Sequence, residues 1–195
     1  GAGCIIHAVH SNEMSAMGGL RKYMPVTHIT FLIACLAISG IWPFSGFFSK
    51  DEILTACFRF SPVMGWIMTG IAAMTAFYMF RLYYGIFWGT ENKTLHAAHT
   101  PHEAPLTMTF PLLFLAAVTC VAGFIPFGNL ISSNGEAYTI HLDMQVATTS
   151  IIIALLSIGL ATWMYAGPKQ PVADKLAHTF SRLHTAAYHR FYMDE

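Results

Sequence analysis

The chain has 195 residues, of which 55% are hydrophobic and only 10% are charged. Soluble domains average about 25% charged residues, so this chain has too little charge to cover the surface of a water-soluble fold. Ten basic residues balance ten acidic ones, and this neutral balance gives no indication of a nucleic-acid partner. The composition therefore excludes a disordered chain, a collagen-like chain and an ordinary soluble enzyme, and it predicts an all-α integral membrane protein.

Residues 1–10 have the pattern of the last turns of an apolar helix that already includes Gly1. At the other end, residues 190–195 show neither a helix cap nor a further apolar span. We therefore expect the chain to be a piece of a longer multi-pass membrane protein.

Four stretches are long enough to cross a bilayer, whose hydrocarbon core takes about 20 helical residues. Together with the first helix end they place a polytopic membrane domain in residues 1–166. The four stretches are residues 25–60, 64–88, 105–125 and 145–165.

The first stretch is too long for one plain helix, and its sequence predicts a break. Pro43 removes a backbone donor, and Gly40 and Gly46 weaken the helix on either side. We predict one helix that ends near Ile41, a second that begins near Phe47, and irregular backbone between them. Irregular backbone at membrane depth survives only where it is buried in protein or lines a water-filled cavity. The alternative is an ordinary loop between two short elements.

The tail, residues 167–195, has a different pattern. Apolar residues recur every three or four positions from Val172 to Phe191, with basic residues between them. This periodicity predicts an amphipathic helix that lies along the membrane or along neighbouring helices, on the cytoplasmic side.

The charges of the connecting segments predict the orientation. If the broken stretch crosses the membrane once, residues 11–24, 89–104 and 166–195 share one side, which holds seven Lys and Arg residues. Residues 61–63 and 126–144, on the other side, hold none. The positive-inside rule then places the first side in the cytoplasm or the equivalent compartment.

Three consecutive ionisable residues, Lys50, Asp51 and Glu52, follow the predicted break. Burying an ionisable group in a membrane costs several kcal/mol, so its presence there predicts a functional site. A buried lysine can bind and release a proton, and a carboxylate that approaches or withdraws can switch it between the two states. The alternative is a lysine at a helix end whose ammonium extends to the interface.

Two further candidate residues for a proton path lie on the predicted membrane spans. Arg81 cannot release a proton, but it can hold a carboxylate in a bidentate pair, and we hypothesise that it competes with Lys50 for Asp51. An interfacial arginine within an aromatic belt is the alternative. His28 titrates in a useful range and is a candidate relay member, although a structural histidine near the interface is equally consistent with its position.

Two motifs closely resemble a known family. The run from Met17 to Pro25, MGGLRKYMP, is followed by GIWPFSGFFSKDEIL from Gly40 to Leu54, and both are similar to chain L of the respiratory NADH–quinone oxidoreductase, complex I. That chain is the bacterial equivalent of mitochondrial subunit 5, and residues 77–84 fit the same family. Where the family commonly has two prolines in the break, this chain has tryptophan and then proline.

The resemblance implies an antiporter-like helical bundle that moves protons while another part of the complex oxidises NADH. In that family the lysine matching Lys50 ends a central row of buried protonatable groups and connects to the exit side. The residues matching Asp51 and Arg81 are linked to its control. The family's other half-channel would lie before Gly1, and its long lateral helix would at most begin within residues 170–195.

The resemblance also implies that NADH, FMN, iron–sulfur clusters and quinone are bound by partner subunits. In this chain no GxGxxG follows a strand, and the four cysteines are scattered without a CxxC, so neither cofactor nor metal binding is predicted. The expected partners are the other membrane and peripheral subunits of complex I and the lipid bilayer of a bacterial inner (plasma) membrane. Two alternatives stay open: a subunit of an Mrp-type multisubunit cation/proton antiporter, and a purely structural membrane anchor.

Overall fold

The computed structural model describes residues 1–90, 101–125, 143–167, 171–181 and 185. Within these ranges the regular structure is entirely helical, which confirms the predicted fold class. The α-helices are α1 (Ala2–Val9), α2 (Pro25–Ser39), α3 (Ser45–Phe60), α4 (Pro62–Phe87), α6 (Leu106–Val121), α7 (Met144–Tyr165) and α8 (Pro171–Thr179). Short 3₁₀ turns are η1 (Met14–Ala16), η2 (Leu20–Lys22) and η3 (Ala122–Phe124).

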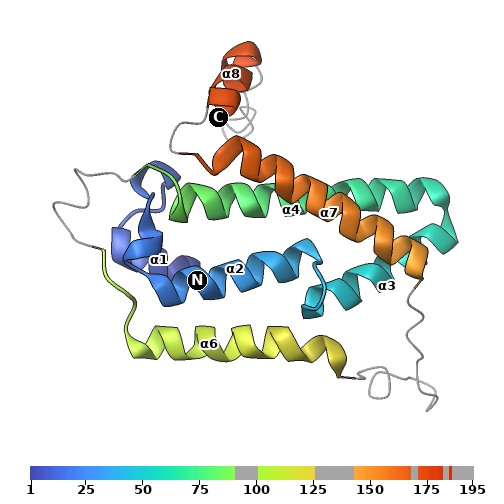
Figure 1. The fold of residues 1–195 in the computed structure, drawn as a ribbon, viewed down its shortest axis with the longest axis horizontal. Coiled ribbons are helices and arrows are strands. Elements are labelled where there is room, and N and C mark those ends of the chain that lie inside the picture. Colours follow the sequence, from blue (N-terminus) through green and yellow to red (C-terminus); the bar gives the residue numbers. More distant parts are fainter. Residues whose placement is uncertain (91–100, 126–142, 168–170, 182–184, 186–195) are drawn as a thin grey trace, which may run out of the picture.

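The long helices lie roughly parallel to one another along the longest axis of the molecule (Figure 1). Helices α2 and α3 follow one another in the same direction, α4 runs back beside them, and α7 crosses over α4. Helix α6 lies at the opposite edge, against α2. This course is the one expected if the broken stretch crosses the membrane once.

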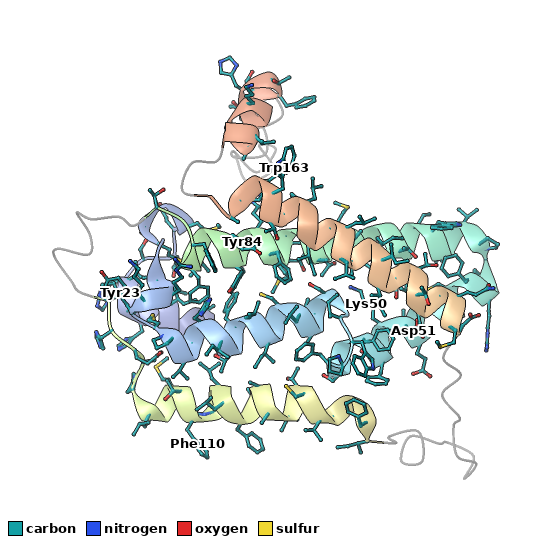
Figure 2. The ribbon with its side chains drawn as sticks, in the orientation of Figure 1. Tyr23, Lys50, Asp51, Tyr84, Phe110 and Trp163 are labelled. Carbon is teal, nitrogen blue, oxygen red and sulfur yellow. The ribbon has the colours of Figure 1, made fainter. Side chains whose placement is uncertain are left out.

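Three of these helical segments are long and apolar enough to cross a membrane: Pro62–Phe87, Leu106–Phe124 and Met144–Tyr165. Their outward surfaces are made of exposed large apolar side chains, among them Phe110 on α6 and Trp163 on α7, which suits contact with lipid (Figure 2). Helix α2 is apolar but shorter, at 15 residues, so it needs α3 to complete a crossing.

The predicted interruption of the first span is confirmed, although it begins earlier than expected. Helix α2 ends at Ser39 because Gly40 adopts a left-handed conformation with φ 77°. The Gly40 N–H then donates to the Ala37 carbonyl, and the Ile41 N–H donates to the Leu36 carbonyl, which closes the helix end. The prediction that this helix continues to Ile41 was therefore wrong by two residues.

The two halves of the broken span meet closely. A Cβ atom on Gly46, in the first turn of α3, would collide with the carbonyl oxygen of Ala37 on α2. On the other side of the break, η3 packs against α3, and the Phe48 and Phe124 rings meet edge to face with centroids 5.4 Å apart. The break is thus packed against protein on the side of Gly40 and Gly46, whereas the Trp42 side chain is 59% exposed on its outer side.

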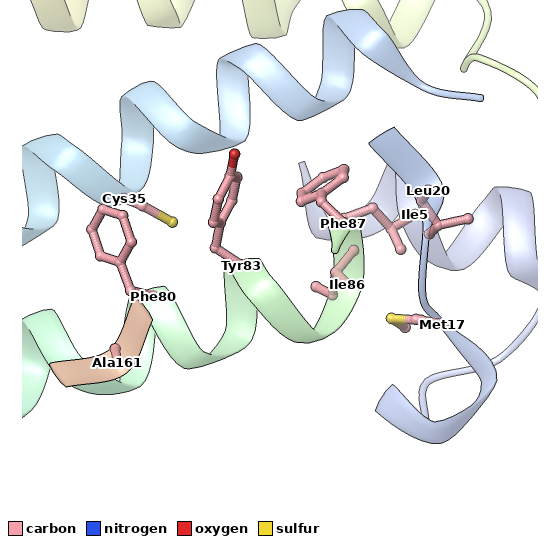
Figure 3. Close-up of a cluster of buried hydrophobic side chains, with 9 residues drawn as sticks. All are labelled: Ile5, Met17, Leu20, Cys35, Phe80, Tyr83, Ile86, Phe87 and Ala161. Atoms are coloured by element: carbon pink, nitrogen blue, oxygen red, sulfur yellow. The ribbon is translucent and has the colours of Figure 1, made fainter. Parts of the chain in front are cut away.

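The main apolar core follows the C-terminal half of α4, where it packs against Cys35 of α2 (Figure 3). Side chains from α1, the 3₁₀ turns, α2, α4 and α7 contribute to it, so it binds the spans into one bundle. Its buried members are Ile5, Met17, Leu20, Cys35, Phe80, Tyr83, Ile86, Phe87 and Ala161.

Parts of three predictions lie outside the described residues. They concern segment 91–100 of one connecting loop, residues 126–142 of another, and most of the tail beyond α8. Within the tail the structure shows helix α8 over Pro171–Thr179. The division into a membrane domain, residues 1–166, and a tail, residues 167–195, stays a prediction.

Candidate functional site

Lys50 lies in the second turn of α3, beside the break. Its Nζ donates hydrogen bonds to the carbonyl oxygens of Ile38 and Ser39, at 3.3 and 3.4 Å. These are carbonyls of the last turn of α2, which have no partner inside that helix. They also form the negative end of the helix dipole, so they suit an ammonium group. The break therefore produces the acceptors that hold the lysine.

Small side chains make room for Lys50. A Cβ atom on Gly40 would lie 2.7 Å from the Lys50 Cδ atom, and the left-handed φ of 77° at this position also favours glycine. Helices α2, α3, α4 and α7 converge here around a small pocket, and Figure 2 shows Lys50 between them. Its walls are Ser39, Gly40, Phe47, Lys50, Thr69, Ala72, Ala73, Ser150, Ile153 and Ala154. Three hydroxyl groups and a lysine thus share one enclosed space.

Asp51 is buried, with only 1% of its surface exposed, but it does not line this pocket. Neither of its carboxylate oxygens has a hydrogen-bond partner among the described residues, and the same holds for the Thr55 hydroxyl one turn later. Asp143, the N-cap residue of α7, is close enough to Asp51 for their negative charges to repel. Glu52, the third ionisable residue, is half-buried. A buried carboxylate without a donor is costly and points to a role in ion or proton transfer.

The structure does not bring Arg81 to Asp51. The Arg81 guanidinium lies over the Tyr165 ring, 5.5 Å from its centroid, and the residue is exposed. Ala73, on the same helix, lines the Lys50 pocket, and eight helical residues beyond it correspond to about 12 Å. The geometry matches the interfacial alternative, because Arg81 is paired with an aromatic ring near the end of its span.

His28 belongs to a second polar cluster, near the opposite end of α2. Its Nε2 atom lies 2.7 Å from the Tyr83 hydroxyl, and the two rings are stacked. The Trp88 indole N–H donates to the same hydroxyl at 3.4 Å, and Arg21 lies over the Trp88 ring at 3.9 Å. Ten residues of helix, about 15 Å, separate His28 from the carbonyls that hold Lys50.

Sequence reasoning missed Glu103. Its Oε2 accepts a hydrogen bond from the Val26 N–H at 2.8 Å, and its Oε1 accepts one from the Thr27 hydroxyl at 2.6 Å. A carboxylate from the segment before α6 thus holds the start of α2, 77 positions earlier. A signal was present, because Met24, where α2 starts, cannot cap a helix with its own side chain.

Comparisons with known proteins identify the family of this chain. Residues 1–76, which include the break and Lys50, match the family model described as "NADH:quinone oxidoreductase/Mrp antiporter, TM". The chain is 38% identical, over its whole length, to NAD(P)H-quinone oxidoreductase chain 5 of Picosynechococcus sp., of which it covers 35%. It is 32% identical over its whole length to the chloroplastic subunit 5 of Chlorokybus atmophyticus, of which it covers 33%.

A third relative carries the name subunit L. NADH-quinone oxidoreductase subunit L of Mycobacterium tuberculosis is 39% identical over 83% of this chain, which covers 27% of that protein. The chain therefore spans about a third of the length of the curated relatives it matches. It is a multi-pass membrane protein that belongs to the NADH-quinone oxidoreductase subunit 5/L family.

Proposed function

We propose that this chain is the part of a proton-translocating membrane subunit of NADH–quinone oxidoreductase that contributes the lysine end of a proton channel. The observation that carries the proposal is the position of Lys50. Its ammonium is held by two open carbonyls at a helix break, inside a pocket formed by four helices. Ionisable groups at such sites in membrane proteins mark proton and ion paths.

The chemistry follows from what each group can exchange. The Ile38 and Ser39 carbonyls accept hydrogen bonds from the protonated amine and so replace part of its hydration. Ser39, Thr69 and Ser150 line the same pocket. The Thr69 and Ser150 hydroxyls donate to the Gly65 and Ala147 carbonyls and can still accept a hydrogen bond, whereas the Ser39 hydroxyl has no partner among the described residues. A relay needs a proton affinity that alternates, so a small movement of the amine relative to these acceptors supplies the switch.

The other candidates take subordinate roles in this proposal. Asp51, buried next to Lys50 in sequence, modulates the lysine, because an ionised carboxylate favours the protonated amine and a neutral one does not, and Glu52 provides a second carboxylate on α3. His28, bonded to Tyr83, is a relay member at the cytoplasmic end of α2. Control of Asp51 by Arg81 would require Arg81 to leave the Tyr165 ring, so this proposal gives Arg81 no part in the proton path.

The redox chemistry belongs, in this proposal, to partner subunits. The relatives are named as NADH- or NAD(P)H-quinone oxidoreductase chains. We infer that NADH, FMN, iron–sulfur clusters and quinone are bound by other subunits of the same complex. This chain then contributes proton transfer within a bacterial inner (plasma) membrane, where it contacts lipid and the neighbouring membrane subunits.

An Mrp-type cation/proton antiporter is a second candidate, because the matched family model names both systems. The relatives described above carry oxidoreductase names, which favours the first candidate. The source of energy for proton transport distinguishes the two candidate functions. An oxidoreductase subunit moves protons only while NADH is oxidised, whereas an antiporter subunit exchanges protons for a cation gradient in the absence of NADH.

Replacing Lys50 tests the proposal. In the assembled complex, Lys50→Ala should abolish most NADH-driven proton pumping, measured by dye quenching in inverted vesicles, while NADH oxidation by the peripheral arm persists in part. Lys50→Arg should also pump poorly, because a guanidinium keeps the charge but does not release its proton.

Lys22→Ala is the matched control. Lys22 is exposed on η2, away from the break, so this variant should pump as the wild type does. Equal amounts of assembled complex in all three variants would exclude an assembly defect. Normal pumping by Lys50→Ala would reject the proposed role.

A further inference from the structure

Helix α2 is closed at both ends by charged side chains that come from other parts of the chain. At its start, Met24 makes no side-chain cap, although the first N–H groups of a helix need acceptors. At its end, Gly40 turns the chain away, and the Ile38 and Ser39 carbonyls accept hydrogen bonds from Lys50.

Glu103 supplies the missing cap. Its two carboxylate oxygens accept hydrogen bonds from the Val26 N–H, from the Thr27 hydroxyl, and from the Ala104 N–H at 3.3 Å. Thr27 is fully buried, so its hydroxyl depends on this partner. Three hydrogen bonds thus fix the Glu103 carboxylate at the positive end of the dipole of α2.

A negative charge and a positive charge therefore bracket a single helix dipole. Helix α2 has 15 residues, which corresponds to a length of about 22 Å. An anion at the N-terminus and a cation at the C-terminus of a helix are each stabilised by its dipole. Inside a membrane protein, charges at this separation are screened much less than they are in water.

We propose that Glu103 is a positioning residue of the Lys50 site, because its carboxylate and the Lys50 ammonium hold the two ends of α2 and are coupled through that helix. The inference rests on the proposed function of Lys50. A charged Glu103 favours the protonated lysine and keeps the carbonyl pair of α2 in place to receive it. A neutral side chain at the same position makes the lysine release its proton more readily.

Other ionisable groups surround the two ends and stay unchanged in the variants below. Helix α6 carries no charged residue between Leu106 and Val121. The ionisable groups around the two ends are Cys4 and His7 on α1, Arg21 and Lys22 on η2, His28 and Cys35 on α2, Asp51, Glu52, Cys57 and Arg59 on α3, Tyr78, Arg81, Tyr83 and Tyr84 on α4, His102 beside Glu103, Cys120 on α6, and Asp143 and Tyr165 at the two ends of α7. Differences between the variants therefore report the change at Glu103.

The test compares the pH profile of NADH-driven proton pumping in inverted vesicles for Glu103→Gln and Thr27→Val. Glutamine has the size of glutamate and keeps an oxygen acceptor, but it removes the charge. Valine has the shape of threonine and removes one hydrogen bond, but it leaves the charge. Glu103→Gln should shift the limb of the profile that Lys50 controls toward acid by about 0.5 pH unit, from one charge at this distance at an effective dielectric constant of about 20. Thr27→Val should keep the wild-type profile.

Glu103→Asp completes the set, because it shortens the side chain and retains the charge. It should keep the wild-type profile even if its pumping rate falls. A wild-type profile for Glu103→Gln, or an acid shift in Thr27→Val or Glu103→Asp, would overturn the inference. If Glu103→Gln fails to assemble, Glu103→Asn takes its place, because it also removes the charge: the same acid shift is expected, and a wild-type profile overturns the inference.

Lys50→Ala in the same vesicles separates this inference from the function on which it rests. If Lys50→Ala stops pumping and the Glu103→Gln profile is unchanged, only the role of Glu103 is wrong. If Lys50→Ala pumps normally, the proposed function is wrong, and the inference is overturned with it.

Discussion

At the scale of single residues, neighbours in sequence have different surroundings. Successive residues of a helix point about 100° apart. Lys50 therefore reaches the carbonyls of α2, whereas Asp51 is buried elsewhere and does not line the Lys50 pocket. Arg81, which sequence reasoning paired with Asp51, lies on the Tyr165 ring instead. A cluster of charges along the chain is thus not a cluster of partners in space.

This separation predicts independent effects of Asp51 and Arg81. In a double-mutant cycle on NADH-driven pumping, Asp51→Asn and Arg81→Met should be additive to within about 0.3–0.5 kcal/mol, as distant sites usually are. The measurement is the logarithm of the pumping rate of the two single variants and of the double variant, each normalised to the amount of assembled complex. A larger interaction energy would show that Arg81 leaves Tyr165 and reaches Asp51 during turnover.

At the scale of the elements, the break between α2 and α3 is a packed structure and not a flexible link. Gly40 admits the Lys50 side chain, and Gly46 admits the Ala37 carbonyl. On the outer side, η3 covers the break through Gly123 and the Phe48 and Phe124 rings. The positions of the Lys50 acceptors therefore depend on the missing side chains of the glycines as well as on the aromatic rings.

Adding one methyl group at the break should be costly. Gly46→Ala places a Cβ atom against backbone, which cannot rotate away, and should destabilise the subunit by about 1–3 kcal/mol and reduce pumping by moving α3 relative to α2. Gly159→Ala, on α7, is the matched control, because a Cβ atom there meets nothing within 4 Å. Thermal denaturation of the purified complex and pumping in vesicles measure the two effects. Equal stability of the two variants would show that the close contact does not constrain the break.

At the scale of the whole molecule, the bundle has its main core near one end and its Lys50 pocket near the other. The core joins α1, α2, α4 and α7 at the end where Arg21 and Lys22 lie. The outer faces of the bundle are apolar, as expected for contact with lipid. Together with the charge asymmetry of the connecting segments, this arrangement predicts that the core lies toward the cytoplasm and that the α3–α4 turn lies on the opposite side.

Cysteine labelling tests this orientation. In a background in which the four native cysteines are replaced by serine, Asn12→Cys should react with a membrane-impermeant maleimide in inverted vesicles only. Val63→Cys, at the exposed start of α4, should react in right-side-out vesicles only. The cysteine-free background gives the unspecific signal. Reaction of both positions from the same side would contradict a single crossing by α2 and α3.

The amino-acid sequence by itself determined the membrane class, the helical spans, the break and the candidate lysine. These follow from local properties: apolar length, the missing donor of Pro43, the freedom of Gly40, and the cost of burying Lys50. Both edges of the break lie two residues earlier than predicted: α2 ends at Ser39, because Gly40 takes the left-handed conformation, and α3 begins at Ser45.

The tertiary structure alone decided which groups meet. That Lys50 is held by Ile38 and Ser39, that Arg81 lies on Tyr165, and that Glu103 caps α2 all depend on how helices pack. No local pattern specifies these contacts, because membrane helices of similar hydropathy can pack in several rotations about their axes, and the rotation determines which side chain meets which carbonyl. Close approaches at small residues and polar contacts between helices select one rotation, and both are properties of pairs of segments far apart in the chain.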